Sequence, residues 1–164
     1  MKTLYLVGGP MGAGKTAVCQ KMKEKLNRSV FLDGDWCWDS HPFQVTEETK
    51  AMVLDNIRFL LNQFLRCSAY DHVIFCWVMH EQSILDDILA GVDCRDCQVK
   101  AVSLLCSPGT LRRRLEKDIA NGLRTEDVIV RSMERLPLYH ALHTIKIHTD
   151  HLDAGTVAER VIAL

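Results

Sequence analysis

The chain has little of what marks membrane, secreted and nucleic-acid-binding proteins. Its apolar runs are short or interrupted by charged side chains, so the sequence predicts neither a membrane-spanning helix nor a signal peptide. The net charge is −1, which argues against a nucleic-acid or membrane-surface partner. The seven cysteines are an odd number for a disulfide framework, so free thiols and a cytoplasmic location are expected.

No repeat, linker or low-complexity segment divides the 164 residues, of which 48% are apolar and 25% charged. This composition predicts one globular domain over residues 1–164. Five apolar runs alternate with segments of helical periodicity, which favours an α/β fold around a five-stranded parallel sheet. The predicted strands are Leu4–Val7, Ser29–Leu32, His72–Val78, Val99–Cys106 and Ile145–His148. The predicted helices begin at or next to Lys15, Thr46, Gln82, Ser107, Thr125 and Ala154.

A glycine-rich segment between the first strand and the first helix carries the strongest functional signal. It fits the pattern G-x-x-x-x-G-K-[ST], in which glycines turn backbone N–H groups toward phosphate oxygens and the following helix points its positive end at them. Lys15 is expected to bind the β- and γ-phosphates, and the Thr16 hydroxyl to bind Mg²⁺. The predicted nucleotide-binding residues are Gly9, Pro10, Met11, Gly12, Ala13, Gly14, Lys15, Thr16 and Ala17.

Other P-loop classes lack their signatures here. The chain contains no Asn-Lys-x-Asp guanine motif and no Ser-Gly-Gly signature, which argues against GTPases and ABC-type ATPases. Its length argues against a helicase or an AAA+ module. A small P-loop kinase with a three-layer P-loop NTPase fold remains.

Two further segments resemble one branch of such kinases. Phe31–Asp35 after the second strand, and Met133–Tyr139 near the C-terminus, are similar to segments of the shikimate and gluconate kinases, within the nucleoside-monophosphate-kinase-like fold. The resemblance implies ATP and Mg²⁺ as cofactors, an acceptor-binding region at about residues 35–70 and a mobile lid at about 117–130. Trp77-Val78-Met79 replaces the Gly-Gly-Gly of shikimate kinases, and Trp36-Cys37 stands where gluconate kinases have Leu-His, so neither shikimate nor gluconate is the expected acceptor.

Two carboxylates follow the second strand. Asp35 lies at the carboxyl end of that strand, where open α/β sheets bind their ligands. The resemblance implies that Asp35 orients the acceptor hydroxyl and that Asp33 helps to hold Mg²⁺ through water. The third strand ends in Phe75-Cys76-Trp77 without a Walker B aspartate, so another acid has to serve the metal. The alternative for both residues is a simple Asp-Gly turn.

Arginines are concentrated between residues 112 and 135. The resemblance makes Arg124 the lid arginine, Arg135 an acceptor or phosphate contact, and Arg114 an adenine-stacking residue. Arg131 lies four residues before Arg135 and is expected on the same helical face. The alternative is a solvated basic helix whose arginines pair with neighbouring acids.

All three tryptophans follow the second and third strands. Trp36 and Trp77 are the predicted acceptor contacts, and Trp38, His80 and Glu81 are further candidates. Aromatic rings there suit a flat or sugar-like acceptor. The alternative is that the rings cover the core.

These observations predict an ATP- and Mg²⁺-dependent kinase that acts on a hydroxyl of a small molecule, such as a metabolite, a nucleoside or an antibiotic. The protein is expected to be a monomer or homodimer. A nucleoside monophosphate kinase is the nearest alternative. The missing Walker B aspartate also leaves open a nucleotide-binding regulatory protein without catalysis. The single C-x-x-C pair, Cys94 and Cys97, predicts no metal or redox function because no second pair stands at suitable spacing.

Overall fold

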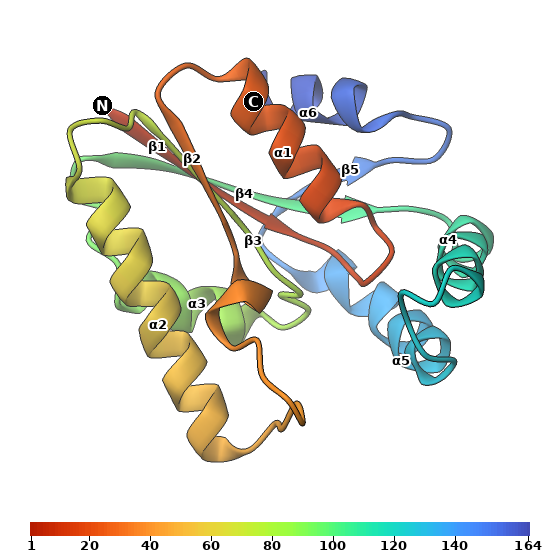
Figure 1. The fold of residues 1–164 in the computed structure, drawn as a ribbon. Coiled ribbons are helices and arrows are strands. Elements are labelled where there is room, and N and C mark those ends of the chain that lie inside the picture. Colours follow the sequence, from red (N-terminus) through yellow and green to blue (C-terminus); the bar gives the residue numbers. More distant parts are fainter.

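The computed structural model describes all residues, 1–164, around one sheet of five parallel strands in the order β2-β3-β1-β4-β5 (Figure 1). The strands are β1 (Lys2–Gly8), β2 (Ser29–Asp33), β3 (His72–Cys76), β4 (Cys97–Leu105) and β5 (Ile145–His148). The predicted α/β class, the five strands and their parallel pairing are confirmed. The third strand ends at Cys76, two residues before the expected Val78.

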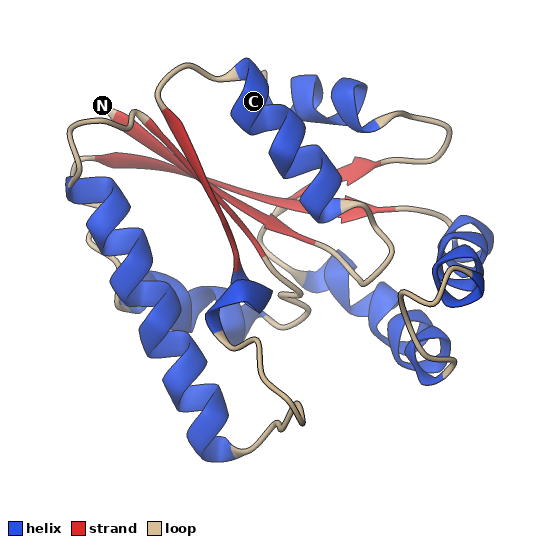
Figure 2. Cartoon of the chain, in the orientation of Figure 1, coloured by secondary structure: helices blue, strands red, loops and turns tan.

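Helices cover both faces of this sheet and complete three layers (Figure 2). They are α1 (Lys15–Lys25), α2 (Glu47–Arg66), α3 (Gln82–Ala90), α4 (Pro108–Ala120), α5 (Asp127–Arg135) and α6 (Ala154–Ile162), with short 3-10 turns η1 (Gly34–Cys37) and η2 (Leu136–Ala141). The helix predicted from Thr125 towards Pro137 is shorter at both ends, since it starts at Asp127 and gives way to η2.

The central strand β1 shows why two core layers form. Successive side chains of a strand point to opposite faces. Leu4 and Leu6 join one buried cluster with residues of α2, α3, α4 and α5, whereas Tyr5 and Val7 join a second cluster with residues of α1 and α6. The continuous apolar run is therefore explained by burial of the strand on both faces.

Side chains at the helix starts act as the sequence predicts. The Thr46 hydroxyl accepts a hydrogen bond from the backbone N–H of Thr49, whose own hydroxyl accepts from the Thr46 N–H. Ser107 caps α4, with Pro108 in the first turn. Each cap satisfies an N–H group that the helix leaves unpaired.

All seven cysteines are free. No helix is both long enough and apolar enough to span a bilayer.

Candidate active site

The phosphate-binding loop joins the end of β1 to the start of α1. Gly12 and Gly14 have φ angles of 84° and 87°, a backbone conformation that residues with a Cβ atom rarely adopt. The first turn of α1 contains no acidic residue, so the positive end of the helix faces the loop without a carboxylate beside it. The loop therefore has the backbone and the charge that a phosphate group requires.

Lys15 extends over this loop, where its Nζ donates a hydrogen bond to the carbonyl oxygen of Pro10 at 3.0 Å. Burial lowers the pKa of the Lys15 ammonium, and the nearby carboxylates of Asp35 and Asp33 act in the opposite direction. The structure thus brings the predicted phosphate-binding lysine and both predicted carboxylates within electrostatic reach of one another.

A cavity of about 350 Å³ lies beside the loop. It is lined by Gly12, Gly14, Lys15, Thr16, Ala17, Arg114, Lys117, Asp118 and Arg124. Five predicted loop residues are among them, whereas Gly9, Pro10, Met11 and Ala13 belong to the loop but do not line the cavity. The cavity joins the loop to α4 and to the segment that follows it, where the sequence places the lid.

Both predicted arginines of this cavity are held by the protein. The Arg124 Nε donates to Asp118 Oδ2 at 2.9 Å, across the turn that ends α4. The Arg114 Nη1 and Nη2 atoms donate to the hydroxyl and the carbonyl oxygen of Thr149, at 3.2 and 3.3 Å. Their guanidinium groups therefore face the space beside the phosphate loop in fixed positions.

Thr16 and Asp33, the predicted metal-binding pair, are in direct contact. The Thr16 hydroxyl donates to Asp33 Oδ2 at 2.9 Å, and Asp33 is only 7% exposed. Nowhere does the chain group three or more His, Cys, Asp or Glu side chains that could hold a metal ion. One carboxylate and one hydroxyl fit Mg²⁺, which takes few protein ligands and completes its shell with phosphate oxygens and water.

Asp33 lies next to the strand end where a Walker B aspartate is missing. Cys76 ends β3, and Asp33 at the end of β2 is its direct neighbour in the sheet register. A carboxylate therefore lies on the adjacent strand, beside the end of β3, and its predicted service to a metal stays a prediction.

Asp35 is fixed by an interaction that the sequence does not predict. The indole Nε1 of Trp77 donates to Asp35 Oδ1 at 3.1 Å, and the Asp35 backbone N–H donates to Asp33 Oδ1 at 3.0 Å. Burial raises the pKa of the Asp35 carboxyl, and the charge of Asp33 raises it further. Oδ1 is occupied by Trp77, so Oδ2 is the oxygen that faces no hydrogen-bond donor of the protein.

Gly34 allows Trp77 to approach this closely. A Cβ atom at residue 34 would lie 2.5 Å from the Trp77 ring, well inside van der Waals contact. We expect Gly34→Ala to lower the free energy of unfolding by about 1–3 kcal/mol, because the indole has to move. Urea unfolding measures this loss. Gly109→Ala is the matched control, since a Cβ there meets no atom within 4 Å. Equal stability of the two variants would contradict the packing described here.

The other two tryptophans pack on different faces of the sheet, since Trp38 joins the cluster under α2 and α3 and Trp36 packs on Phe31 of the cluster under α1 and α6. Trp38 contacts both Phe43 and Trp77 edge to face, with ring centroids 4.9 and 5.9 Å apart. Trp36 packs against Phe31 at 5.1 Å, yet remains 54% exposed. The role of Trp36 as an acceptor contact stays a prediction, whereas Trp77 binds the Asp35 carboxylate.

The two predicted arginines of α5, Arg131 and Arg135, have different surroundings. Arg131 is exposed and lies 3.8 Å from Asp127 on the same helix, and no interaction links it to the other site residues. Arg135 is half-buried and forms no hydrogen bond or ion pair. Its charge lowers the pKa of His80, second to the larger effect of burial, so the two side chains are near one another. His80 also lies 3.6 Å from Glu81.

Sequence reasoning missed Thr149, which holds Arg114. Its signal was present, because Thr149 directly follows β5 and therefore lies at the carboxyl edge of the sheet. The next residue, Asp150, accepts hydrogen bonds from the backbone N–H of Ser107, and the Ser107 and Thr110 hydroxyls help to lower its pKa to about 2. This loop ties β5 to the start of α4.

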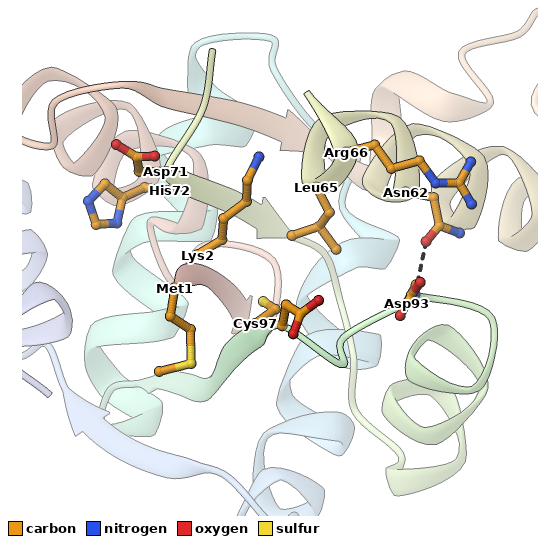
Figure 3. A pocket seen from close by; sticks show the side chains of 10 residues that line it. Met1, Lys2, Asn62, Leu65, Arg66, Asp71, His72, Asp93 and Cys97 are labelled. Carbon is orange, nitrogen blue, oxygen red and sulfur yellow. Dashed lines mark hydrogen bonds between the residues drawn. The ribbon is translucent and has the colours of Figure 1, made fainter. Parts of the chain in front are cut away.

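A larger hollow of about 710 Å³ lies elsewhere, at the amino-terminal starts of β1, β3 and β4 (Figure 3). Lys2, His72 and Cys97 mark those starts, and the backbone N–H of Asp93 donates to Asn62 Oδ1 at 2.9 Å on its far wall. Cys97 of the C-x-x-C pair is thus the first residue of β4. Open α/β sheets bind ligands at the opposite, carboxyl edge, so this hollow is not the candidate active site.

A comparison with protein families completes this description. A family model described as an AAA domain matches residues 6–134. The chain belongs to this AAA domain family. The match runs from β1 through the phosphate loop to α5. The expectation that the length excludes an AAA+ module therefore does not extend to this AAA domain, which fits within the chain.

Solved structures show the same fold. A shikimate kinase from Acinetobacter baumannii, in complex with shikimate, is 24% identical, with a TM-score of 0.65 over 99% of this chain and 91% of that chain. A gluconokinase from Sinorhizobium meliloti is 17% identical, with a TM-score of 0.71 over 98% and 90%. A tunicamycin resistance protein from Deinococcus radiodurans is 17% identical, with a TM-score of 0.71 over 99% and 95%. A comparison with curated sequences finds no match. The AAA domain here thus has the fold expected from the shikimate and gluconate kinase resemblance.

Proposed function

We propose that the protein is an ATP- and Mg²⁺-dependent kinase that transfers the γ-phosphoryl group to a hydroxyl of a small molecule. The observation that carries this proposal is the convergence of Lys15, Asp33 and Asp35 at one edge of the sheet, where each carboxylate acts on the Lys15 ammonium. A phosphate-binding cation, a metal-binding pair and a separate carboxylate are the parts that phosphoryl transfer to a hydroxyl needs. The fold shared with shikimate kinase and gluconokinase supports it.

Each residue has a defined task in this proposal. The loop N–H groups and Lys15 bind the β- and γ-phosphates, while Thr16 and Asp33 would hold Mg²⁺, which neutralises phosphate charge. Asp35 Oδ2 accepts the hydrogen bond of the acceptor hydroxyl. The acceptor oxygen forms a bond to the γ-phosphorus as the bond to the bridging oxygen of ADP breaks, and the hydroxyl proton passes to Asp35. Arg124 stabilises the charge on the transferred group.

Arg135 favours a second candidate, a nucleoside monophosphate kinase. It is a half-buried arginine near the acceptor end and has no ion pair or hydrogen bond within the protein, so it could bind a phosphate on the acceptor. The third expectation, a regulatory protein without catalysis, depended on the missing Walker B aspartate. The contact between Thr16 and Asp33 weakens that argument, because a carboxylate lies beside the hydroxyl that we propose to bind the metal.

The proposal is tested by ADP release from Mg·ATP in the presence of pooled acceptors. The pools are nucleosides, nucleoside monophosphates, sugars with sugar acids, and hydroxyl-bearing antibiotics, and Lys15→Ala is the blank. We expect one pool to raise ADP release above the rate without acceptor. ATP binding with no acceptor-dependent release in any pool would favour the regulatory protein.

The pH dependence of transfer offers a check on Asp35. Its ionised carboxylate accepts the hydroxyl proton, so activity falls as the pH drops through its pKa. The Trp77 hydrogen bond lowers that pKa, against the larger effect of burial. We therefore expect Trp77→Phe to move the acidic limb of the kcat/KM profile to higher pH. Trp38→Phe, which removes no hydrogen bond to Asp35, is the control, and identical acidic limbs in all three proteins would contradict the assignment.

A further inference from the structure

The cavity beside the phosphate loop is lined by four cationic side chains and a single acidic one. The cations are Lys15, Arg114, Lys117 and Arg124, and the acid is Asp118. A carboxylate in a phosphate-binding cavity repels the phosphate oxygens and therefore weakens nucleotide binding. The position of Asp118 calls for an explanation other than binding of the nucleotide.

Asp118 binds Arg124 through one nitrogen of the guanidinium group. Its Oδ2 accepts a hydrogen bond from the Arg124 Nε at 2.9 Å, whereas the Nη1 and Nη2 atoms of Arg124 donate no hydrogen bond within the protein. The side chains of Asp118 and Arg124 are only 28% and 31% exposed, so solvent screens this pair less than an ion pair on the open surface. Two Nη groups thus remain free to bind phosphate oxygens.

The backbone turn after α4 brings the same two residues together. The Asp118 carbonyl oxygen accepts a hydrogen bond from the backbone N–H of Leu123 at 2.8 Å. Gly122 has a φ angle of 72°, a conformation that allows the chain to reverse direction where the helix ends. Arg124 therefore returns to the side of Asp118 although six positions separate them in the sequence.

Helix α4 is itself packed against the phosphate loop. Leu115, one turn before Asp118, is fully buried. A Cβ atom at Gly12 of the loop would lie 2.9 Å from the Leu115 Cδ2 atom, so the helix and the loop are in close contact. Arg114 also ties this helix to Thr149 after β5. Asp118 therefore belongs to an element whose position relative to the loop is set by packing.

The charge of Arg124 reaches both ends of the proposed site. Burial has the largest effect on the pKa values of Lys15 and Asp35, and the Arg124 guanidinium lowers both pKa values. Lys15 belongs to the nucleotide end of the site and Asp35 to the acceptor end. A cation that acts on both ends suits a phosphoryl group that passes from one to the other.

From these observations, and resting on the proposed kinase function, we propose that Asp118 is a positioning residue for phosphoryl transfer. Its carboxylate holds Arg124 by Nε, so that the free Nη groups bind the oxygens of the γ-phosphoryl group during transfer. The carboxylate repels bound ATP but, through Arg124, favours the transition state. Removal of Asp118 should therefore lower kcat without weakening ATP binding.

Variants of Asp118 test this division between kcat and binding, with Mg·ATP and the acceptor pool that stimulates ADP release. Asp118→Ala should lower kcat at least about tenfold, because a small displacement of a catalytic group is costly. Its Kd for ATP, measured by calorimetry without acceptor, should be equal or lower. Asp118→Asn keeps an oxygen that can accept from Nε and should recover most of the lost kcat. Glu116→Ala, which removes an exposed acid of the same helix, is the control and should change neither quantity.

A double-variant cycle tests whether Asp118 acts through Arg124. Arg124→Ala should lower kcat by at least about a hundredfold, as expected for loss of one preorganised donor. Addition of Asp118→Ala to this variant should change kcat by less than about twofold, because the residue that Asp118 holds is already absent. Losses that multiply in the double variant would overturn the inference. A higher Kd for ATP in Asp118→Ala would also overturn it, because Asp118 would then support nucleotide binding.

Failure of the inference and failure of the proposed function give different results. If the unmodified protein binds ATP but no acceptor stimulates ADP release, the kinase function is wrong and the role of Asp118 is wrong with it. If the unmodified protein phosphorylates an acceptor and Asp118→Ala has the same kcat, the kinase function stands and the positioning role is wrong.

Discussion

Asp35→Asn is expected to reduce kcat/KM for phosphoryl transfer by at least about a hundredfold, because general-base groups contribute on the order of 10²–10⁴. Asparagine keeps the size of the side chain and an oxygen that can accept from the Trp77 indole, so the local packing is preserved. It removes the charge that orients the acceptor hydroxyl and takes its proton. Steady-state ADP release with a phosphorylated acceptor measures the loss.

Stability and nucleotide binding are the controls for Asp35→Asn. The pKa of Asp35 is raised in the folded protein, so the carboxyl binds a proton more tightly than in the unfolded chain. Its ionised form therefore opposes folding above that pKa, and the variant should melt at the same temperature or higher. ATP should still raise the melting temperature. Asp39→Asn, an exposed acid on the same segment, should keep full activity, and full activity in Asp35→Asn would remove Asp35 from the mechanism.

Lys15→Ala should remove most of the transfer activity and most of the stabilisation by ATP. At 100 times Kd a ligand adds about 2.7 kcal/mol of stability, or roughly 5–11 °C in a chain of this size. If removal of the ammonium weakens ATP binding about a hundredfold, the same ATP concentration adds only about 0.4 kcal/mol, or roughly 1 °C. Transfer should fall by at least about a hundredfold, as expected for one preorganised donor. Thermal melting with and without ATP measures the first effect.

Lys23→Ala is the matched control, because Lys23 is an exposed lysine two turns further along α1. This variant should keep the ATP shift and the activity of the unmodified protein. A Lys15→Ala protein that retains the full shift would show that the loop does not bind the phosphates through this side chain.

The strands and the phosphate loop were predictable because their signals are local. Leu4–Val7 is apolar on both faces and ends in glycines, which suffices to predict a buried parallel strand before the loop. Thr46 and Ser107 were found as helix caps because a cap needs only a few consecutive residues. Helix ends were less predictable, since the passage from α5 to η2 depends on packing of Leu136 and Tyr139 into the core.

The interactions that complete the site were not predictable, because they join residues far apart in the sequence. The hydrogen bond from Trp77 to Asp35 spans 42 positions and depends on the neighbouring places of β2 and β3 in the sheet. The bonds from Arg114 to Thr149 span 35. Sequence alone predicted the kinds of side chain at strand ends but not which of them meet. The role of Trp77 as the partner of Asp35 is the clearest result of this kind.

The most direct test of the central claim is whether the γ-phosphoryl group of ATP appears on an acceptor. The unmodified protein is incubated with Mg·ATP, isotopically labelled at the γ-phosphate, and the acceptor pool that stimulates ADP release, and the products are analysed by mass spectrometry. The account predicts an acceptor heavier by one labelled phosphoryl group, formed by the unmodified protein at least about a hundredfold faster than by Asp35→Asn. Labelled inorganic phosphate as the sole product, in equal amount from both proteins, would contradict it.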